Sequence, residues 1–384
     1  MLLRNTIQFF RLKPVVAVGF LFATSSLLVA VWASALPFIK LRLGLNDSQL
    51  GLLLLFAPLG SIVGVLTSTT VFSKIKIGNW LGMGNLAQCT LFCLEVYSPN
   101  VIWFSGALFL RGYFGFLNGV ANNMVASRLE NEYNRKFLST CHAMYSIGGA
   151  IGAAYTAILF GFEIKSLYQI LGMYVLVTIT VFSLRPFYLK HDYFIHSKSG
   201  FKLPNKSILG LSFICMVIFM TEGSIVDWSS IYMKRELLAP LFYISLGYGG
   251  FSVAMTLGRL NGDIIIPKLG DKKIIIYGSL IAAFGILMVA INSIIPLVIF
   301  GFILTGIGCC CIVPVLFATA SKIPNVPAVQ GYGMITTGGL VGFLAGPSII
   351  GFISEQYTLS LGFIFTFIML LFAAFAGYRN RYLG

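Results

Sequence analysis

Residues 220–232 read MTEGSIVDWSSIY and lie in an apolar run bracketed by Lys206 and Lys234, so the run is centred near residue 220. At about 1.5 Å per helical residue, Glu222 lies roughly 3 Å from that centre and Asp227 roughly 10 Å. Half of the hydrocarbon core of a bilayer measures about 15 Å, so both carboxylates belong inside it. A charge there costs roughly 2.5–3.5 kcal/mol, and two charges on one segment therefore predict a functional site. The alternative is that both side chains face a hydrated crevice and only cap neighbouring helices.

The composition of the chain indicates an all-α polytopic membrane protein. Apolar residues make up 58% of the chain and charged residues only 10%, whereas soluble domains carry about 25% charged residues. The net charge of +14 does not indicate a nucleic-acid partner, because Lys and Arg gather in every second loop, a pattern that orients membrane proteins. The seven cysteines lie within apolar segments without histidines at metal-ligand spacing, so we expect no metal and no other cofactor.

Twelve apolar runs are long enough to cross a bilayer. In the first half they are expected at residues 14–36, 48–72, 79–97, 101–125, 137–160 and 166–185. In the second half they are expected at residues 207–233, 240–262, 273–292, 295–319, 328–353 and 356–377. The first run follows basic residues as a secretion signal would, but it is too long for one, so it predicts a retained transmembrane helix.

The distribution of cations predicts the orientation of the chain. With the N-terminus inside the cell, the cytoplasmic segments hold twenty Lys and Arg residues and the opposite side holds five. This asymmetry predicts a protein of the inner (plasma) membrane with both termini in the cytoplasm. Arg111 is the cation left within a span.

The basic stretch 190–206 is predicted to be a cytoplasmic loop between two six-helix bundles, residues 1–189 and 207–384. Internal repetition supports this division. AMYSIGGAIGAAYTAILFGF (143–162) aligns without gaps with GMITTGGLVGFLAGPSIIGF (333–352), and four glycines recur in it. Two pseudo-symmetric bundles of this kind are typical of transporters that bind their substrate between the halves.

A charged motif follows the eighth run, where residues 258–263 read GRLNGD and residues 270–273 read GDKK. It resembles the loop signature of the major facilitator superfamily, which implies the twelve-helix major facilitator fold. Arg259 and Asp263 are four residues apart and share a helix face. We therefore expect a cytoplasmic latch, formed by Gly258, Arg259, Asp263 and Lys272. The corresponding first-half loop, residues 71–80, lacks the acid.

Arg111 and the following Gly115 resemble the helix-4 signature of the same superfamily, an intramembrane arginine with a small residue one turn later. A buried arginine needs a carboxylate, a cage of carbonyls or an anionic substrate as its partner. In the superfamily, helices 1, 4, 7 and 10 line the central cavity, so the resemblance implies that Arg111 and Glu222 lie on opposing walls. We expect these two residues and Asp227 to couple transport to protons.

A closer resemblance is to the MosC-like group, candidate rhizopine permeases related to the fucose permeases. It rests on WASALP (32–37), NGVANN (118–123), HAMYSIGG (142–149) and EGSIVDW (222–228). In such relatives the position of Asn118 is acidic and takes part in proton coupling. This chain has Asn there and no acid in its first span, so coupling would rest on Glu222 and Asp227.

The polar and aromatic residues of these stretches are the candidates for substrate binding, namely Asn118, Asn122, Asn123, His142, Trp32 and Trp228. The asparagines either bind a polyol or join helices by hydrogen bonds. His142 either relays protons or bonds between helices. The two tryptophans, at comparable places in the first span of each half, either stack on a sugar-like ring or anchor the membrane interface. Glu95, near the outer end of its span, is expected to be solvated.

These features favour a secondary active transporter, a monomeric permease that moves a small sugar-, polyol- or amino-sugar-like solute through the bilayer with protons, by alternating access. A proton-driven exporter of drugs or metabolites is the alternative, since an acidic cavity suits cations, although Arg111 argues for a neutral or mixed-charge solute. No serine nucleophile elbow, HExxH pair or nucleotide-binding loop is present, so the chain is not expected to be an enzyme or an ATP-driven pump. A non-transporting receptor is a further possibility.

Overall fold

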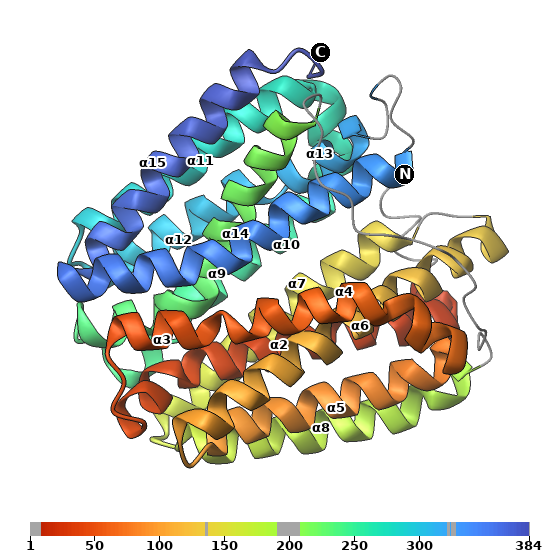
Figure 1. Cartoon of the computed structure of the whole chain (residues 1–384), viewed down its shortest axis with the longest axis horizontal. Helices are drawn as coiled ribbons and strands as arrows, with labels where there is room; N and C mark the ends of the chain where they lie inside the picture. The colour runs from red at the N-terminus through yellow and green to blue at the C-terminus, as the bar shows by residue number, and fades with distance from the viewer. Residues whose placement is uncertain (1–8, 135–136, 190–207, 321–322, 324–327, 384) are drawn as a thin grey trace. The chain divides into compact units, whose positions relative to one another are not determined.

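The structure is a computed structural model that describes residues 9–134, 137–189, 208–320, 323 and 328–383, and these residues form helices and no strands (Figure 1). The helices of the N-terminal half are α2 (Lys13–Arg42), α3 (Asp47–Leu54), α4 (Phe56–Lys74), α5 (Ile77–Tyr97), α6 (Val101–Tyr133), α7 (Leu138–Gly161) and α8 (Ser166–Tyr188). Those of the C-terminal half are α9 (Leu209–Arg235), the short η2 (Leu241–Tyr243), α10 (Leu246–Leu269), α11 (Asp271–Ile291), α12 (Ile295–Cys309), α13 (Ile312–Ala320), α14 (Ala328–Gln356) and α15 (Leu359–Arg379). The predicted loop 190–206 lies outside the described residues.

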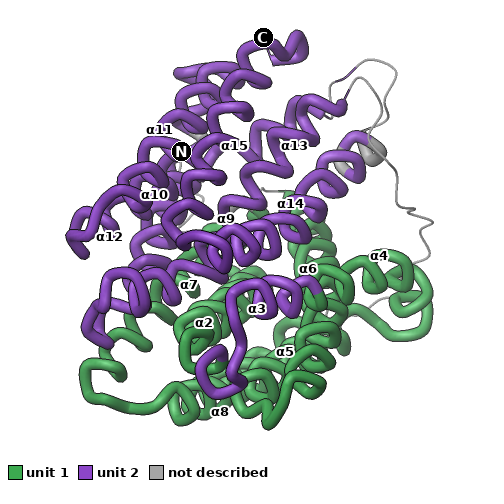
Figure 2. Tube along the Cα trace, turned by 60° about the vertical axis from the view of Figure 1, so that its left-hand side comes forward, with its two compact units in different colours: residues 1–39, 56–200 green, residues 40–55, 201–384 purple. Residues whose placement is uncertain are grey.

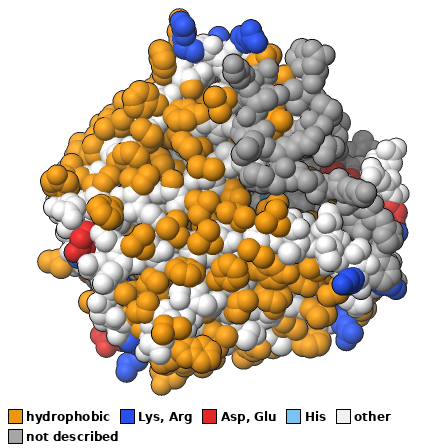
Figure 3. Space-filling model, viewed as in Figure 1, with side chains coloured by type: hydrophobic (Ala, Val, Ile, Leu, Met, Phe, Trp, Pro, Cys, Tyr) orange, Lys and Arg blue, Asp and Glu red, His pale blue; other side chains and the backbone are white. Residues whose placement is uncertain are grey.

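Among the described residues, ten helical spans are long and apolar enough to cross a membrane by length and composition. The helices α5 and α6 complete the set of spans predicted from the sequence. In Figure 3, hydrophobic side chains cover the visible helices, and charged side chains appear toward the margins of the view. The prediction of an all-α polytopic membrane protein is confirmed.

Two of the spans are interrupted. The helices α3 and α4 are separated at Leu55, and α12 and α13 are separated at Cys310 and Cys311. Pro58 and Pro314 follow these breaks by three or four residues. Because proline removes the hydrogen bond to the carbonyl four residues earlier and its ring clashes with that carbonyl, each proline accounts for the break before it.

The contacts divide the chain into two compact units (Figure 2). The first unit comprises Met1–Ile39 and Phe56–Gly200, and the second comprises Lys40–Leu55 and Phe201–Gly384. The sequence-based division at the central loop stays a prediction. The contacts add one feature that the sequence did not indicate, since residues 40–55 pack with the second unit.

In the first unit, glycines bring α7 close to α2. A Cβ atom on Gly148 would overlap the carbonyl of Ala23, and a Cβ atom on Gly152 would lie 2.6 Å from the carbonyl oxygen of Leu27. Only a residue without a side chain allows the two helix backbones to approach so closely.

The second unit repeats this contact between α14 and α9. A Cβ atom on Gly338 would overlap the carbonyl of Ser212, and one on Gly342 would overlap the carbonyl of Met216. In both units the two glycines and their two partners are each four residues apart, so the sequence repeat corresponds to a repeated helix–helix contact. These glycines therefore form close-packing surfaces in both units.

This register corrects the comparison of the two tryptophans. Counted from Ala23 in α2 and from Ser212 in α9, the residue that corresponds to Trp32 is Thr221 and not Trp228. Trp228 lies two turns further along its helix, so it is not the structural counterpart of Trp32.

The short helix α3 begins at a capping box formed by Asn46 and Gln49. Its first residue, Asp47, is only 1% exposed. The Asp47 carboxylate accepts hydrogen bonds from three side chains of the second unit, and we call these residues together the Asp47 cluster: Lys40, Asp47, Arg235 and Ser354. The cluster joins α3 to α9 and α14.

Along the first turns of α3, its backbone packs directly against the backbone of α14. A Cβ atom on Gly351 would lie 2.6 Å from the carbonyl oxygen of Asp47, and one on Gly51 would lie 3.0 Å from that of Pro347. The hydroxyl of Ser348 donates a 2.9 Å hydrogen bond to the carbonyl of Gly51. These contacts explain why α3 belongs to the second unit although α4, which follows it directly, does not.

Candidate functional site

The first unit contains an ion pair between Arg111 of α6 and Glu95 of α5. Nε of Arg111 donates a 2.7 Å hydrogen bond to Oε1 of Glu95. The Glu95 side chain is 0% exposed and that of Arg111 is 15% exposed. The expectation that Glu95 is solvated is therefore wrong, because the arginine compensates its charge inside the helix bundle. The second carboxylate oxygen, Oε2, is buried and accepts no hydrogen bond from the described residues.

Two aromatic rings lie close to the guanidinium group of Arg111. Its Cζ atom lies 4.4 Å from the ring centroid of Trp32 and 5.0 Å from that of Phe92. A cation over an aromatic face is attracted by the quadrupole of the ring. Trp32 is 1% exposed, so it is not an interface anchor, and its face toward Arg111 is already occupied. Two of the predicted site residues thus lie together.

Asn118 belongs to a buried polar network. Its Nδ2 donates to Oε1 of Gln88 over 3.3 Å, and its Oδ1 accepts from Nδ2 of Asn85 over 3.2 Å. The hydroxyl of Thr24 donates to Oδ1 of Asn85 over 3.3 Å. The network joins α2, α5 and α6, which supports the interpretation of Asn118 as a helix-joining residue. A role in substrate binding stays a prediction.

The other two asparagines of α6 differ in their surroundings. Asn122 is 2% exposed, and its Oδ1 has no hydrogen-bond partner among the described residues. Asn123 donates to the carbonyl of Gly119 over 2.8 Å, and its Oδ1 lies 3.1 Å from Nε2 of His142 in α7. His142 is exposed. The structure therefore brings two predicted site residues, Asn123 and His142, into contact across neighbouring helices.

The second unit contains the other intramembrane charge pair. Oε1 of Glu222 in α9 lies 3.6 Å from Nη2 of Arg259 in α10, and the two side chains are 17% and 20% exposed. The helix α10 continues past Arg259 to Leu269, so Arg259 lies within the helix and not in a cytoplasmic loop. The partner of Glu222 within its unit is thus Arg259. The expectation that Arg111 and Glu222 lie on opposing walls of a cavity stays a prediction.

The remaining latch residues have separate surroundings. A Cβ atom on Gly258 would overlap Sγ of Cys310, at the break between α12 and α13. Nζ of Lys272 lies 5.7 Å from the ring centroid of Tyr378 in α15. The side chain of Asp263 lies outside the described part of the structure. The cytoplasmic latch stays a prediction.

Asp227 and Trp228 follow Glu222 along α9. Asp227 is half-buried and Trp228 is fully buried. A Cβ atom on Gly351 of α14 would lie 3.1 Å from Cζ2 of Trp228. Trp228 therefore packs against α14 and is not an interface anchor, and its proposed stacking on a sugar-like ring stays untested.

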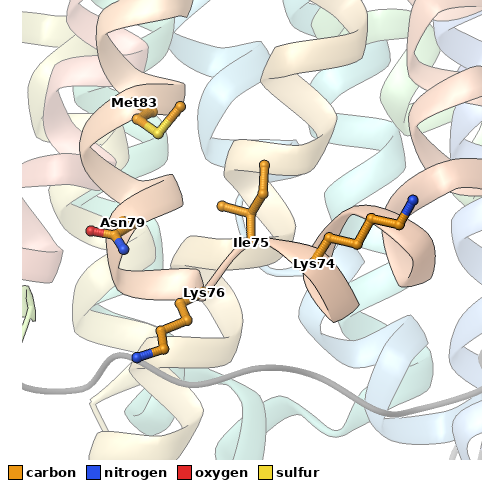
Figure 4. Close-up of a pocket in the computed structure, with 5 residues that line it drawn as sticks. All are labelled: Lys74, Ile75, Lys76, Asn79 and Met83. Carbon is orange, nitrogen blue, oxygen red and sulfur yellow. The ribbon is translucent and has the colours of Figure 1, made fainter.

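A pocket of about 400 Å³ lies where α4 meets α5, lined by Lys74, Ile75, Lys76, Asn79 and Met83. Figure 4 shows that the two lysines point away from each other. None of the predicted site residues lines this pocket, so it does not indicate the substrate site. In the described part of the chain, no group of three or more His, Cys, Asp and Glu side chains is placed to hold a metal ion.

Two charged residues of the structure were not anticipated as parts of a site, Glu95 and Asp47. A signal for Glu95 was present, since Arg111 requires a partner and Glu95 is the single acid of the preceding span. For Asp47 the signal was an acid that follows Lys40 and Arg42 after a short loop and stands at the start of an apolar run.

Comparison with known proteins gives consistent matches. Residues 211–382 match the family model of the Major Facilitator Superfamily. An uncharacterised MFS-type transporter of Yersinia pestis is 33% identical, with 92% of each chain covered. Membrane protein MosC of Rhizobium meliloti is 27% identical over 91% of this chain and 86% of that protein. In fold, the chain is similar to a bacterial homologue of the human lysosomal transporter Spinster, with a TM-score of 0.72 at 12% identity and 96% of both chains covered.

Proposed function

Because the chain belongs to the Major Facilitator Superfamily, we propose that it is a secondary active transporter that moves a small polar solute with protons by alternating access. The family consists of multi-pass membrane transporters of small molecules and not of enzymes. We further propose that the chain acts as a monomer in the inner (plasma) membrane with both termini in the cytoplasm. The cation asymmetry of the sequence supports this orientation.

The observation that carries the proposal is the pair of Glu222 and Arg259. Glu222 lies at the centre of α9, where an unpaired charge would be costly. The separation of 3.6 Å is longer than a hydrogen bond, and both side chains keep some exposure. An ion pair of this kind opens at lower cost than a fully buried one, so it suits a carboxylate that gains and loses a proton.

Protonation of Glu222 would remove the negative charge that it places beside Arg259. The alternative conformations of such proteins differ by a few kcal/mol, and a partly exposed ion pair contributes up to about 1 kcal/mol. Loss of one such contact is therefore enough to shift the balance between conformations. Asp227 lies further along α9, and we assign it to solute affinity and not to the proton step.

The proposed solute class follows from the polar groups of α6. Asn122 has a buried amide oxygen without a hydrogen-bond partner among the described residues, and Asn123 and His142 form a partly accessible pair. Amide and imidazole groups both donate and accept hydrogen bonds, as the hydroxyls of a sugar or polyol do. These residues support a sugar-, polyol- or amino-sugar-like solute.

Uptake into proteoliposomes tests the proposal, with a panel of polyols and amino sugars and with or without an imposed proton gradient. We expect accumulation only when the gradient is present. Glu222→Gln should exchange solute down its own gradient but lose accumulation, whereas Asp227→Asn should change the apparent affinity and keep the proton dependence. Glu236→Gln, the same substitution at the end of α9, is the matched control. A Glu222→Gln protein that still concentrates solute would exclude Glu222 from coupling.

Export is the competing direction, and the same vesicles decide it. A proton-driven exporter exchanges solute for protons. When the proton gradient across the vesicle membrane is reversed, it therefore concentrates solute on the side from which protons are supplied. Arg111 and Arg259 place positive charge beside Glu95 and Glu222, so we do not expect cationic drugs to be carried.

A further inference from the structure

Arg111 is fixed in place but uses only part of its hydrogen-bonding capacity. Its Nε bonds to Glu95, and no hydrogen bond with the described residues involves Nη1 or Nη2. Arginine carries five N–H donors in a planar fork, so four of them are unused. The side chain is 15% exposed, so it is not fully enclosed by the protein.

The aromatic neighbours restrict how a ligand can approach Arg111. Trp32 and Phe92 lie against the guanidinium at 4.4 and 5.0 Å, and Glu95 occupies its Nε edge. The N–H groups that stay available for a ligand are those of Nη1 and Nη2. A carboxylate fits that geometry because its two oxygens match the fork with two parallel hydrogen bonds.

The second independent observation is the burial and the incomplete hydrogen bonding of Glu95. It is 0% exposed, and its Oε2 accepts no hydrogen bond from the part of the chain that the structure describes, although it carries the charge that balances Arg111. When a carboxylate binds the same guanidinium, two negative charges share one positive charge. Like charges at one site disfavour the ionised form of both, so the buried Glu95 takes up a proton. The site then stays neutral, with one arginine and one anion.

We propose that Arg111 binds the carboxylate of the transported solute and that Glu95 accepts a proton as the solute binds. This inference rests on the proposed function and narrows its substrate class to polar monocarboxylates such as sugar acids. A phosphate monoester carries about 1.5–2 negative charges, more than this site can balance. The proton on Glu95 is distinct from the one that the proposed function assigns to Glu222.

Binding to the purified full-length chain tests the assignment. Each monocarboxylate is paired with the neutral alcohol of the same carbon skeleton, from glycerate and glycerol to gluconate and glucitol, with glycerol phosphate as the more highly charged probe. Calorimetry measures affinity, and a pH indicator in weak buffer measures proton uptake. We expect at least one carboxylate to bind more tightly than its alcohol and than the phosphate ester, with proton uptake.

Two variants with matched controls complete the test. Arg111→Lys keeps the charge but loses the fork, so it should weaken carboxylate binding at least about tenfold. Arg128→Lys, at an exposed position of the same helix, should leave binding unchanged. Glu95→Gln should bind the carboxylate without proton uptake, whereas Glu222→Gln should bind it with proton uptake. If Arg111→Lys does not fold, the difference in proton uptake between the Glu95→Gln and Glu222→Gln proteins tests the proposal instead.

The contradicting results are equally specific. Binding of the alcohols alone, no binding by any pair, unchanged affinity in a folded Arg111→Lys protein, or full proton uptake by Glu95→Gln would each overturn the assignment. If polyols accumulate on a proton gradient while no carboxylate binds, this inference fails and the proposed function stands. If carboxylates bind as expected but no solute accumulates on a gradient, the proposed function fails and the assignment of Arg111 stands.

Discussion

Arg235 of α9 donates a charged hydrogen bond to the carboxylate of Asp47 in α3, although 188 residues separate them in the sequence. Asp47 is 1% exposed and also accepts from Lys40, so one buried acid balances two cations. Such an arrangement stabilises a structure mainly through the cost of breaking it, because removal of the acid leaves Lys40 without this partner and Arg235 with only the partly exposed Glu236.

Asp47→Asn is therefore expected to destabilise the protein. We expect a loss of about 2–3 kcal/mol, below the 3–5 kcal/mol typical of a fully buried pair, because the Arg235 side chain is 39% exposed. Thermal unfolding in detergent measures it. Glu236→Gln removes a partly exposed partner of the same arginine and should cost less than about 1 kcal/mol. Equal losses in the two variants would contradict the role of the Asp47 cluster.

The close contact between α14 and α9 predicts a clear difference between two glycines of one helix. Gly342→Ala places a methyl group on the carbonyl of Met216 and should cost about 1–3 kcal/mol of unfolding free energy. Gly333→Ala meets no atom within 4 Å and should be neutral or stabilising by up to about 1 kcal/mol. Unfolding midpoints of the two variants provide the comparison, and a stable Gly342→Ala protein would argue against the contact.

The pair of Glu222 and Arg259 predicts non-additive effects on stability. Arg259→Met leaves the carboxylate without its counter-ion and should cost about 1–3 kcal/mol. Adding Glu222→Gln should restore part of the loss, because no charge is then left unbalanced. A double-mutant cycle of unfolding midpoints measures the coupling. Strictly additive losses would show that the two side chains do not interact.

The orientation of the chain is tested by labelling. Cysteines introduced into the 190–206 loop or beside Arg379, in a background without the native cysteines, should react only with reagents supplied from the cytoplasmic side. A cysteine next to Glu163, on the predicted opposite side, is the control and should react only from outside. Labelling of the central loop from outside would reverse the orientation.

The positions of the helices were predictable because a bilayer demands long apolar runs, which can be read along the chain. The helix breaks at Leu55 and Cys310 also had a signal in the sequence, Pro58 and Pro314, but we did not predict the breaks from it. Proline is tolerated in many membrane helices, so its presence alone does not say whether a helix will break.

The charge partners were less predictable. Counting residues gives the depth of Arg111 and Glu222 but not the direction in which their side chains point, and the partner depends on that direction. In the structure each has a partner in its own unit, Glu95 for Arg111 and Arg259 for Glu222. The long side chain of arginine adds to the uncertainty, since its charge can lie well away from its backbone.

The placement of residues 40–55 affects how the protein can be divided. A fragment that begins after the central loop would lack Asp47, and Arg235 would lose the acid that balances it. The complementary N-terminal fragment would carry α3 without α14, the helix against which its glycine backbone packs. The C-terminal half of a split gene would therefore not encode the complete second unit, and a co-expressed N-terminal fragment would have to supply α3 before that unit reaches its native packing.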